Sequence, residues 1–204
     1  MAAYAKSQAD SKTIEETGSL TYFEGDVSIN DTPGEIGDVI NNDDTITTGE
    51  NSYCEVIFGQ ANIFRLEENT TTRINWKNSD INVKKGTIAV VFSKLDKFLH
   101  DDKDFTVSTP SAVAGVRGTV FFVKIENENK TYLCICNGEL NINNVDNGLN
   151  IGAGHHKAYR FIKEGNKIIT ESAPLIYHDD KKVEMLAAKI DYTIPWNDKV
   201  YNSY

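Results

Sequence analysis

The sequence is poor in the features that mark disulfide-rich or membrane-spanning proteins. It has three cysteines and four prolines among 204 residues. An odd number of cysteines leaves at least one thiol unpaired within the chain, so a disulfide-stapled scaffold is not expected. No stretch approaches the run of about eighteen apolar residues that a membrane helix requires, which argues against a membrane-spanning segment.

Basic charge and catalytic motifs are also scarce. Thirty acidic residues stand against twenty-one basic ones, which gives a net charge of −9. Nucleic acid and anionic membrane surfaces are therefore not expected as partners of this acidic protein. The sequence contains no G-x-S-x-G, H-E-x-x-H, G-x-G-x-x-G or P-loop motif, and we do not expect an enzyme.

The residues that are abundant favour β-structure. Nine Tyr and nine Phe accompany many Thr, Val and Ile, and 40% of the chain is hydrophobic, enough for one sizeable core. We predict an all-β fold, a compact antiparallel sandwich or roll, over residues 18–145. Residues 146–204 are predicted to add a β-hairpin, a short helix and an extended tail. Val183, Leu186, Ala187 and Ile190 fall at helical spacing and predict that the helix packs on the β domain.

The stretch from 104 to 125, DFTVSTPSAVAGVRGTVFFVKI, predicts two strands separated by a break. Pro110 cannot donate to a sheet ladder, so the first strand should end beside it. The segment 119–123, TVFFV, is apolar on both faces, a pattern typical of a strand that is covered on each side. Arg117 lies between Gly115 and Gly118, where it is either structural or a binding residue for an anionic ligand.

Thr109-Pro110 followed by the segment 113–119, VAGVRGT, resembles the signature of FecR-like domains. The resemblance covers about residues 35–145. It implies a periplasmic or extracellular domain with a signalling role, like the periplasmic regulators of iron-siderophore uptake. The transmembrane helix and the sigma-factor-binding segment of such regulators are not recognisable in this chain. The resemblance therefore implies a binding, sensory or scaffold domain that contacts an envelope protein or a small ligand.

Five residues in the C-terminal half could bind a metal ion: Cys134, Cys136, His155, His156 and His178. The resemblance implies that Leu133 and Ile135 face the core. Because side chains alternate along a strand, the two cysteines should then lie together on the opposite face. We expect the two histidines at 155 and 156 to lie in a strand and to face opposite sides. If the aromatic residues at 159 and 161 face the core, His156 is the histidine that meets the cysteines, with His178 as fourth ligand.

Two sulfurs and two imidazoles would suit zinc, and also iron–sulfur or haem chemistry. The spacing matches no standard zinc finger, and C-x-x-C and C-x-x-C-H are absent. Two other readings of Cys134 and Cys136 remain open: small apolar residues under the C-terminal segment, or thiols with a redox or interchain role. Cys54 alternates with Val56 and Phe58, which predicts a buried free thiol.

Residues 1–17 show no periodicity and are predicted to be a loose leader. Ala3-Tyr4-Ala5 has the A-x-A pattern that ends many signal peptides, so the leader is either a signal-peptide remnant or a disordered polar segment.

Overall fold

The computed structural model describes residues 17–59, 61–93, 105–143 and 148–197. The leader predicted for residues 1–17 lies almost wholly outside this range. No helix within the described residues is long and apolar enough to cross a bilayer.

Strands account for most of the described chain, and they alternate with short turns. The first nine strands are β1 (Gly18–Glu24), β2 (Val27–Ile29), β3 (Thr32–Pro33), β4 (Val39–Ile40), β5 (Thr45–Thr48), β6 (Tyr53–Phe58), β7 (Asn62–Leu66), β8 (Thr71–Asn75) and β9 (Asp80–Lys85). They are followed by β10 (Thr87–Phe92), β11 (Phe105–Ser108), β12 (Val113–Asn127), β13 (Lys130–Ile142), β14 (Leu149–Ala153), β15 (Lys157–Glu164), β16 (Lys167–Ala173) and the helix α1 (Asp180–Ala188).

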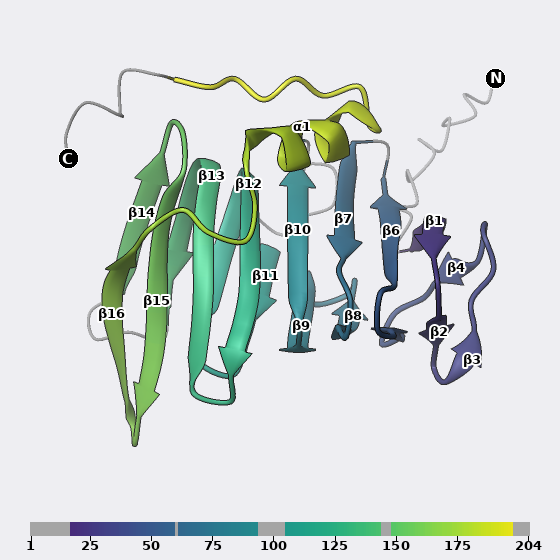
Figure 1. Ribbon diagram of the computed structural model, residues 1–204, viewed down its shortest axis with the longest axis horizontal. Helices are drawn as coiled ribbons and strands as arrows, with labels where there is room; N and C mark the ends of the chain where they lie inside the picture. Colours follow the sequence, from purple (N-terminus) through teal and green to yellow (C-terminus); the bar gives the residue numbers. More distant parts are fainter. Residues whose placement is uncertain (1–16, 60, 94–104, 144–147, 198–204) are drawn as a thin grey trace, which may run out of the picture.

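The strands form one continuous curled sheet (Figure 1). The order along its main path is β3-β2-β5-β8-β9-β11-β12-β10-β7-β6-β1-β4, and β13 links this path to β14, β15 and β16. All described pairings are antiparallel except the parallel pairing of β11 with β9. The predicted antiparallel all-β roll is therefore confirmed, with this one parallel pair as the departure.

The two longest strands, β12 and β13, each take part in two layers. The first half of β12 pairs with β11, and its second half pairs with β10. Likewise, the first half of β13 pairs with β15, and its second half pairs with β14. The register between β12 and β13 shifts between Arg117 and Val120, where Gly118 has a φ of +54°. The sheet curls because both strands continue through this irregularity from one layer into the other.

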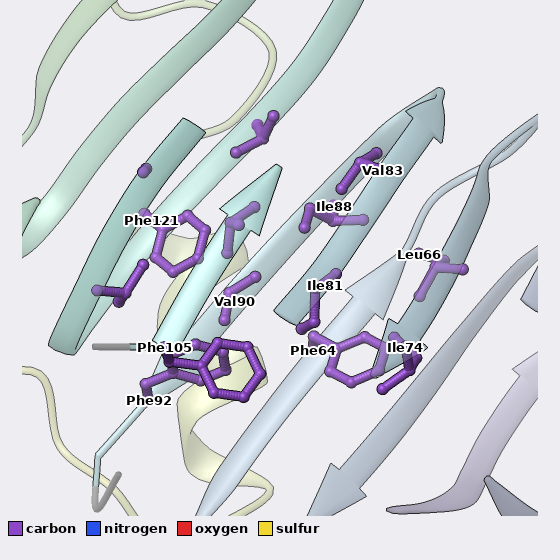
Figure 2. Close-up of a cluster of buried hydrophobic side chains, with 14 of the residues drawn as sticks. Phe64, Leu66, Ile74, Ile81, Val83, Ile88, Val90, Phe92, Phe105 and Phe121 are labelled. Carbon is purple, nitrogen blue, oxygen red and sulfur yellow. The ribbon is translucent and has the colours of Figure 1, made fainter. Parts of the chain in front are cut away.

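The inner core lies between these layers. Figure 2 shows its aromatic and branched side chains, among them Phe64, Phe92, Phe105 and Phe121. Phe92 and Phe105 meet edge to face with ring centroids 4.9 Å apart, an arrangement that aromatic pairs prefer. These rings join β11 in one layer to β10 and β12 in the other, so the inner core fixes the curl of the sheet.

A second apolar cluster, here called the outer cluster, lies on the opposite face of β10, β12 and β13. Phe121 and Val123 of β12 point into the inner core, whereas Val120 and Phe122 point into the outer cluster. The helix α1 covers this face with Val183, Leu186 and Ala187. Figure 1 places α1 across the ends of β10 and β7. The cover predicted on both faces of segment 119–123 is therefore present, and the predicted packing of the helix is confirmed.

The helix begins directly after an aspartate that caps its first turn. The side chain of Asp179 accepts a hydrogen bond from the backbone N–H of Lys182, so Asp179 is the N-cap. Ile190, the last member of the predicted apolar stripe, lies just beyond the helix and packs against the outer cluster.

The predicted division of the chain at residue 145 remains a prediction. The sheet itself runs on past this position, because β13 pairs with both β14 and β15. The hairpin of β15 and β16, the helix and an extended segment follow in the predicted order.

Candidate metal centre

Strand β13 presents both cysteines on the outer face of the sheet. Leu133 and Ile135 lie in the inner core, and Cys134 and Cys136 lie in the outer cluster with no exposed surface. The predicted alternation is therefore confirmed. Since the two thiols share one face of one strand, they can approach a common ligand from the same side.

His156 reaches the cysteines from the loop that precedes β15. Its backbone N–H donates to the carbonyl oxygen of Cys136 over 3.0 Å, which anchors the loop to β13. Its Nδ1 lies 3.5 Å from the Sγ of Cys134. As expected, the side chain of Phe161 faces the inner core and His156 is the histidine that meets the cysteines.

The expectation that His155 and His156 face opposite sides is wrong. Both imidazoles contact Asp180, and their ring centroids are 5.1 Å apart. The reason is local: the two residues precede β15, and His156 has a φ of +39°, in the left-handed region. Strand alternation therefore does not apply to this pair.

His178 comes from the segment that links β16 to α1 and crosses the outer face of β15, β13 and β12 (Figure 1). Its Nε2 lies 3.3 Å from the Sγ of Cys136, and its ring stacks on Phe122 at a centroid distance of 4.3 Å. Within the described chain, its Nδ1 is the one buried side-chain nitrogen or oxygen that has no hydrogen-bond partner. Burial of this imidazole is therefore poorly compensated by hydrogen bonds alone.

The four donor atoms converge on one point. The Sγ atoms of Cys134 and Cys136 and the ring nitrogens of His156 and His178 all lie within 4.8 Å of one another. Zinc–sulfur bonds of about 2.3 Å and zinc–nitrogen bonds of about 2.0 Å give tetrahedral edges of roughly 3.3–3.8 Å. The two sulfur–nitrogen distances of 3.3 and 3.5 Å already lie in that range.

Asp180 contacts His156 on the side of the imidazole that is opposite the cysteines. Its Oδ1 is 2.7 Å from the Nε2 of His156, the ring nitrogen that faces away from the cysteines. Its Oδ2 is 2.9 Å from the Nε2 of His155. A carboxylate that accepts the second N–H of a ligand histidine fixes the tautomer and orientation of that imidazole, a common arrangement at metal sites. The ring of Trp196 covers His155 and His156 at centroid distances of 4.5 and 5.3 Å.

Electrostatics favour one thiolate in the cluster. Burial opposes ionisation of Cys134, but hydrogen bonds from Cys136, His156 and His178 outweigh it and hold the pKa of Cys134 down to about 4. Burial, together with the neighbouring Cys134, raises the pKa of Cys136 well above its ordinary value. Burial alone would lower the pKa of His156, yet its contacts with Cys134 and Asp180 raise it. The cluster therefore favours a negative charge on the cysteine pair, and a bound cation would release the protons that the donor atoms still hold.

The sequence did not indicate every residue of the site. Asp180, Phe122 and Trp196 were not assigned to the site from the sequence. The proximity of Asp180 to His178 in the sequence was the one available signal. His155 contacts Asp180 and lies outside the group of four donors. Arg117 lies in β12 opposite Glu139, and the ligand-binding role predicted for it remains a prediction.

Cys54 is separate from the cluster. It is fully buried in the inner core as a free thiol, as predicted, and burial raises its pKa to about 12. It belongs to the inner core and cannot contribute to the metal centre.

Comparison with known protein families identifies the type of domain. Residues 44–141 match the family model described as FecR protein, so this part of the chain is FecR-like. The resemblance carried by the 109–119 motif is therefore confirmed. FecR proteins are regulators and not enzymes, in agreement with the expectation of a non-enzymatic protein.

The solved structures that resemble this chain include two crystal structures of a candidate anti-sigma factor from Parabacteroides distasonis, at 1.65 and 2.50 Å resolution. Each has a TM-score of 0.49 and 14% sequence identity. Each alignment covers 63% of this chain and 59% of the other. A search of curated proteins found no match.

Proposed function

We propose that the chain is a metal-binding regulatory domain of FecR type, which acts in the periplasm or outside the cell and contacts an envelope protein. The FecR-like part of the chain, residues 44–141, supports the regulatory role. The observation that carries the metal-binding part is the convergence of Cys134, Cys136, His156 and His178 within 4.8 Å.

Zinc is the metal that this donor set favours. Two thiolates and two imidazoles form a tetrahedral set that suits zinc, and Asp180 supports one imidazole from behind. A single ion fits donors that lie this close together better than an iron–sulfur cluster, whose ligands are spread over several metal atoms. Haem would need room for a macrocycle between the buried donors, and both cysteines are fully buried.

The arrangement favours a regulatory or structural ion over a catalytic one. Catalytic zinc sites have three protein ligands and an open position for water or substrate, whereas structural sites have four. Here four protein donors surround the point of convergence, and three of their residues are buried. This agrees with the non-enzymatic character of the FecR family.

Metal titration of the reduced protein tests the site. We expect one equivalent of Co²⁺ to give the visible absorption of a tetrahedral thiolate complex, and Zn²⁺ to displace it. Cys134→Ser should abolish this absorption, because it removes a ligand from the cluster. The matched control is Cys54→Ser, which changes the thiol in the inner core and should leave the stoichiometry at one. Absence of binding, or equal binding by Cys134→Ser and the control, would reject the metal site.

The location and the partner need a separate measurement. Fractionation of cells that express the chain from its own gene should recover it from the periplasm or the culture medium. In vivo cross-linking should then join it to an envelope protein. Recovery only from the cytoplasm would overturn this part of the proposal and leave the metal site untouched.

A further inference from the structure

The segment after β16 covers the outer cluster and carries one of the four metal donors. We call residues 174–197 the clasp. Its apolar side chains Val183, Leu186, Ala187 and Ile194 pack on the outer face of the sheet. On the sheet side the same cluster contains fully buried residues of β7, β10, β12 and β13: Ile63, Ala89, Val91, Val120, Phe122 and Tyr132. Without the clasp, this apolar face would be open to water.

Polar contacts tie the helical part of the clasp to β6 and to the end of β7. Lys189 Nζ lies 2.6 Å from Glu55, and Lys182 Nζ lies 2.9 Å from Glu67. The side chain of Glu55 is only 2% exposed, so its charge depends on Lys189 and on Arg65 for compensation. These contacts hold the clasp near β6 and β7.

The metal centre ties the other part of the clasp to β13. Cys134, Cys136 and His156 belong to the sheet and the loop before β15, whereas His178 belongs to the clasp. Asp180, also in the clasp, hydrogen-bonds to His156. The four-donor site is therefore complete only when the clasp is docked.

From this division of ligands we infer that metal binding and docking of the clasp on the outer face are coupled, so that loss of the ion loosens the clasp and uncovers the apolar face. This inference rests on the proposed metal site. An ion that binds the docked state better than the open state must stabilise docking. By reciprocity, any change that weakens docking must weaken metal binding by the same factor.

Hydrogen exchange of the reduced, full-length chain measures the first half of the coupling. We expect amides of residues 174–197 to exchange at least about tenfold faster with a chelator than with one equivalent of Zn²⁺, as coupling energies of this kind commonly produce. Amides of β7 and β10, which lie in the centre of the sheet, should change little. Equal protection of the clasp with and without Zn²⁺ would overturn the coupling.

The reciprocal test removes a docking contact that is not a ligand. Leu186→Ala should weaken Zn²⁺ affinity about tenfold, because Leu186 is a buried clasp residue in the outer cluster. Leu20→Ala is the matched control, since Leu20 is buried in the inner core on β1. It should destabilise the fold and leave Zn²⁺ affinity within about twofold. Lys189→Ala, which removes the ion pair with Glu55, provides a milder second variant if Leu186→Ala fails to fold.

The outcomes separate this inference from the proposed function. Stoichiometric Zn²⁺ binding that depends on Cys134, combined with unchanged clasp exchange, would refute the coupling and leave the metal site standing. Failure to bind Zn²⁺ would refute both the metal site and its coupling to the clasp. Equal Zn²⁺ affinity in the Leu186→Ala, Lys189→Ala and Leu20→Ala variants would also overturn the coupling.

Discussion

Replacement of Asp180 by asparagine tests whether this cluster is organised as a metal site. The Asp180 carboxylate accepts from the Nε2 of His156 at 2.7 Å, while the Nδ1 of His156 faces Cys134. Burial alone would raise the pKa of Asp180, but hydrogen bonds from His155 and His156 lower it below its ordinary value. The group is therefore ionised at neutral pH, and its charge adds to the electron donation of the imidazole.

Asparagine keeps the size of the side chain and one acceptor oxygen but removes the charge. Loss of such an outer partner commonly costs about 10- to 100-fold in metal affinity, or about 1.4 to 2.8 kcal/mol. We expect Asp180→Asn to weaken Zn²⁺ binding by this factor. Competition against a chromophoric chelator at constant pH measures the two dissociation constants directly.

Asp179→Asn is the matched control. Asp179 precedes Asp180 and caps the same helix, and asparagine caps a helix about as well as aspartate. Both variants remove one negative charge near the helix N-terminus, so effects on the helix dipole are similar. Equal Zn²⁺ affinities for the two variants would refute the supporting role of Asp180.

Two further predictions concern the stability of the fold, and urea denaturation measures both. Gly86→Ala should lower the free energy of unfolding by more than about 2 kcal/mol, because Gly86 has a φ of +90° and an added Cβ would lie 2.5 Å from the Cα of Thr70. Gly37→Ala, at a φ of +96° with no atom within 4 Å, should cost only the backbone strain, and equal losses would contradict the predicted clash. Burial raises the pKa of Asp80, although its hydrogen bond from Ser108 opposes the shift. The ionised carboxylate therefore lowers the free energy of unfolding at neutral pH. This destabilisation disappears as the pH falls through the raised pKa and the carboxylate becomes protonated. Asp80→Asn should accordingly be the more stable protein at pH 7, with an advantage that shrinks on acidification, and a constant difference would contradict this reasoning.

The local pattern of apolar residues in the sequence was sufficient to predict several parts of this structure. The alternation in segment 131–137 placed Cys134 and Cys136 on the face opposite the inner core. The apolar stripe around Val183 and Leu186 indicated the helix and its packed side. These predictions succeed because the period of a strand or a helix is a local property of the backbone, and it decides which side chains share a face.

Other features depended on contacts between distant segments. The sequence proposed His156 and His178 as partners of the cysteines, but only the folded chain brings the Nε2 of His178, 42 residues beyond Cys136, to 3.3 Å from its sulfur. The role of Asp180, the common side of His155 and His156, and the parallel pairing of β11 with β9 likewise required the tertiary structure.

The sequence by itself determined the class of fold, the FecR-type motif and the faces of the strands, because each depends on neighbouring residues. Tertiary structure alone decided that the segment after β16 crosses β13 and completes the donor set. The segment takes this path because it buries the outer cluster beneath the clasp. Such packing joins residues that are distant in the sequence, so the period of a strand or helix does not predict it.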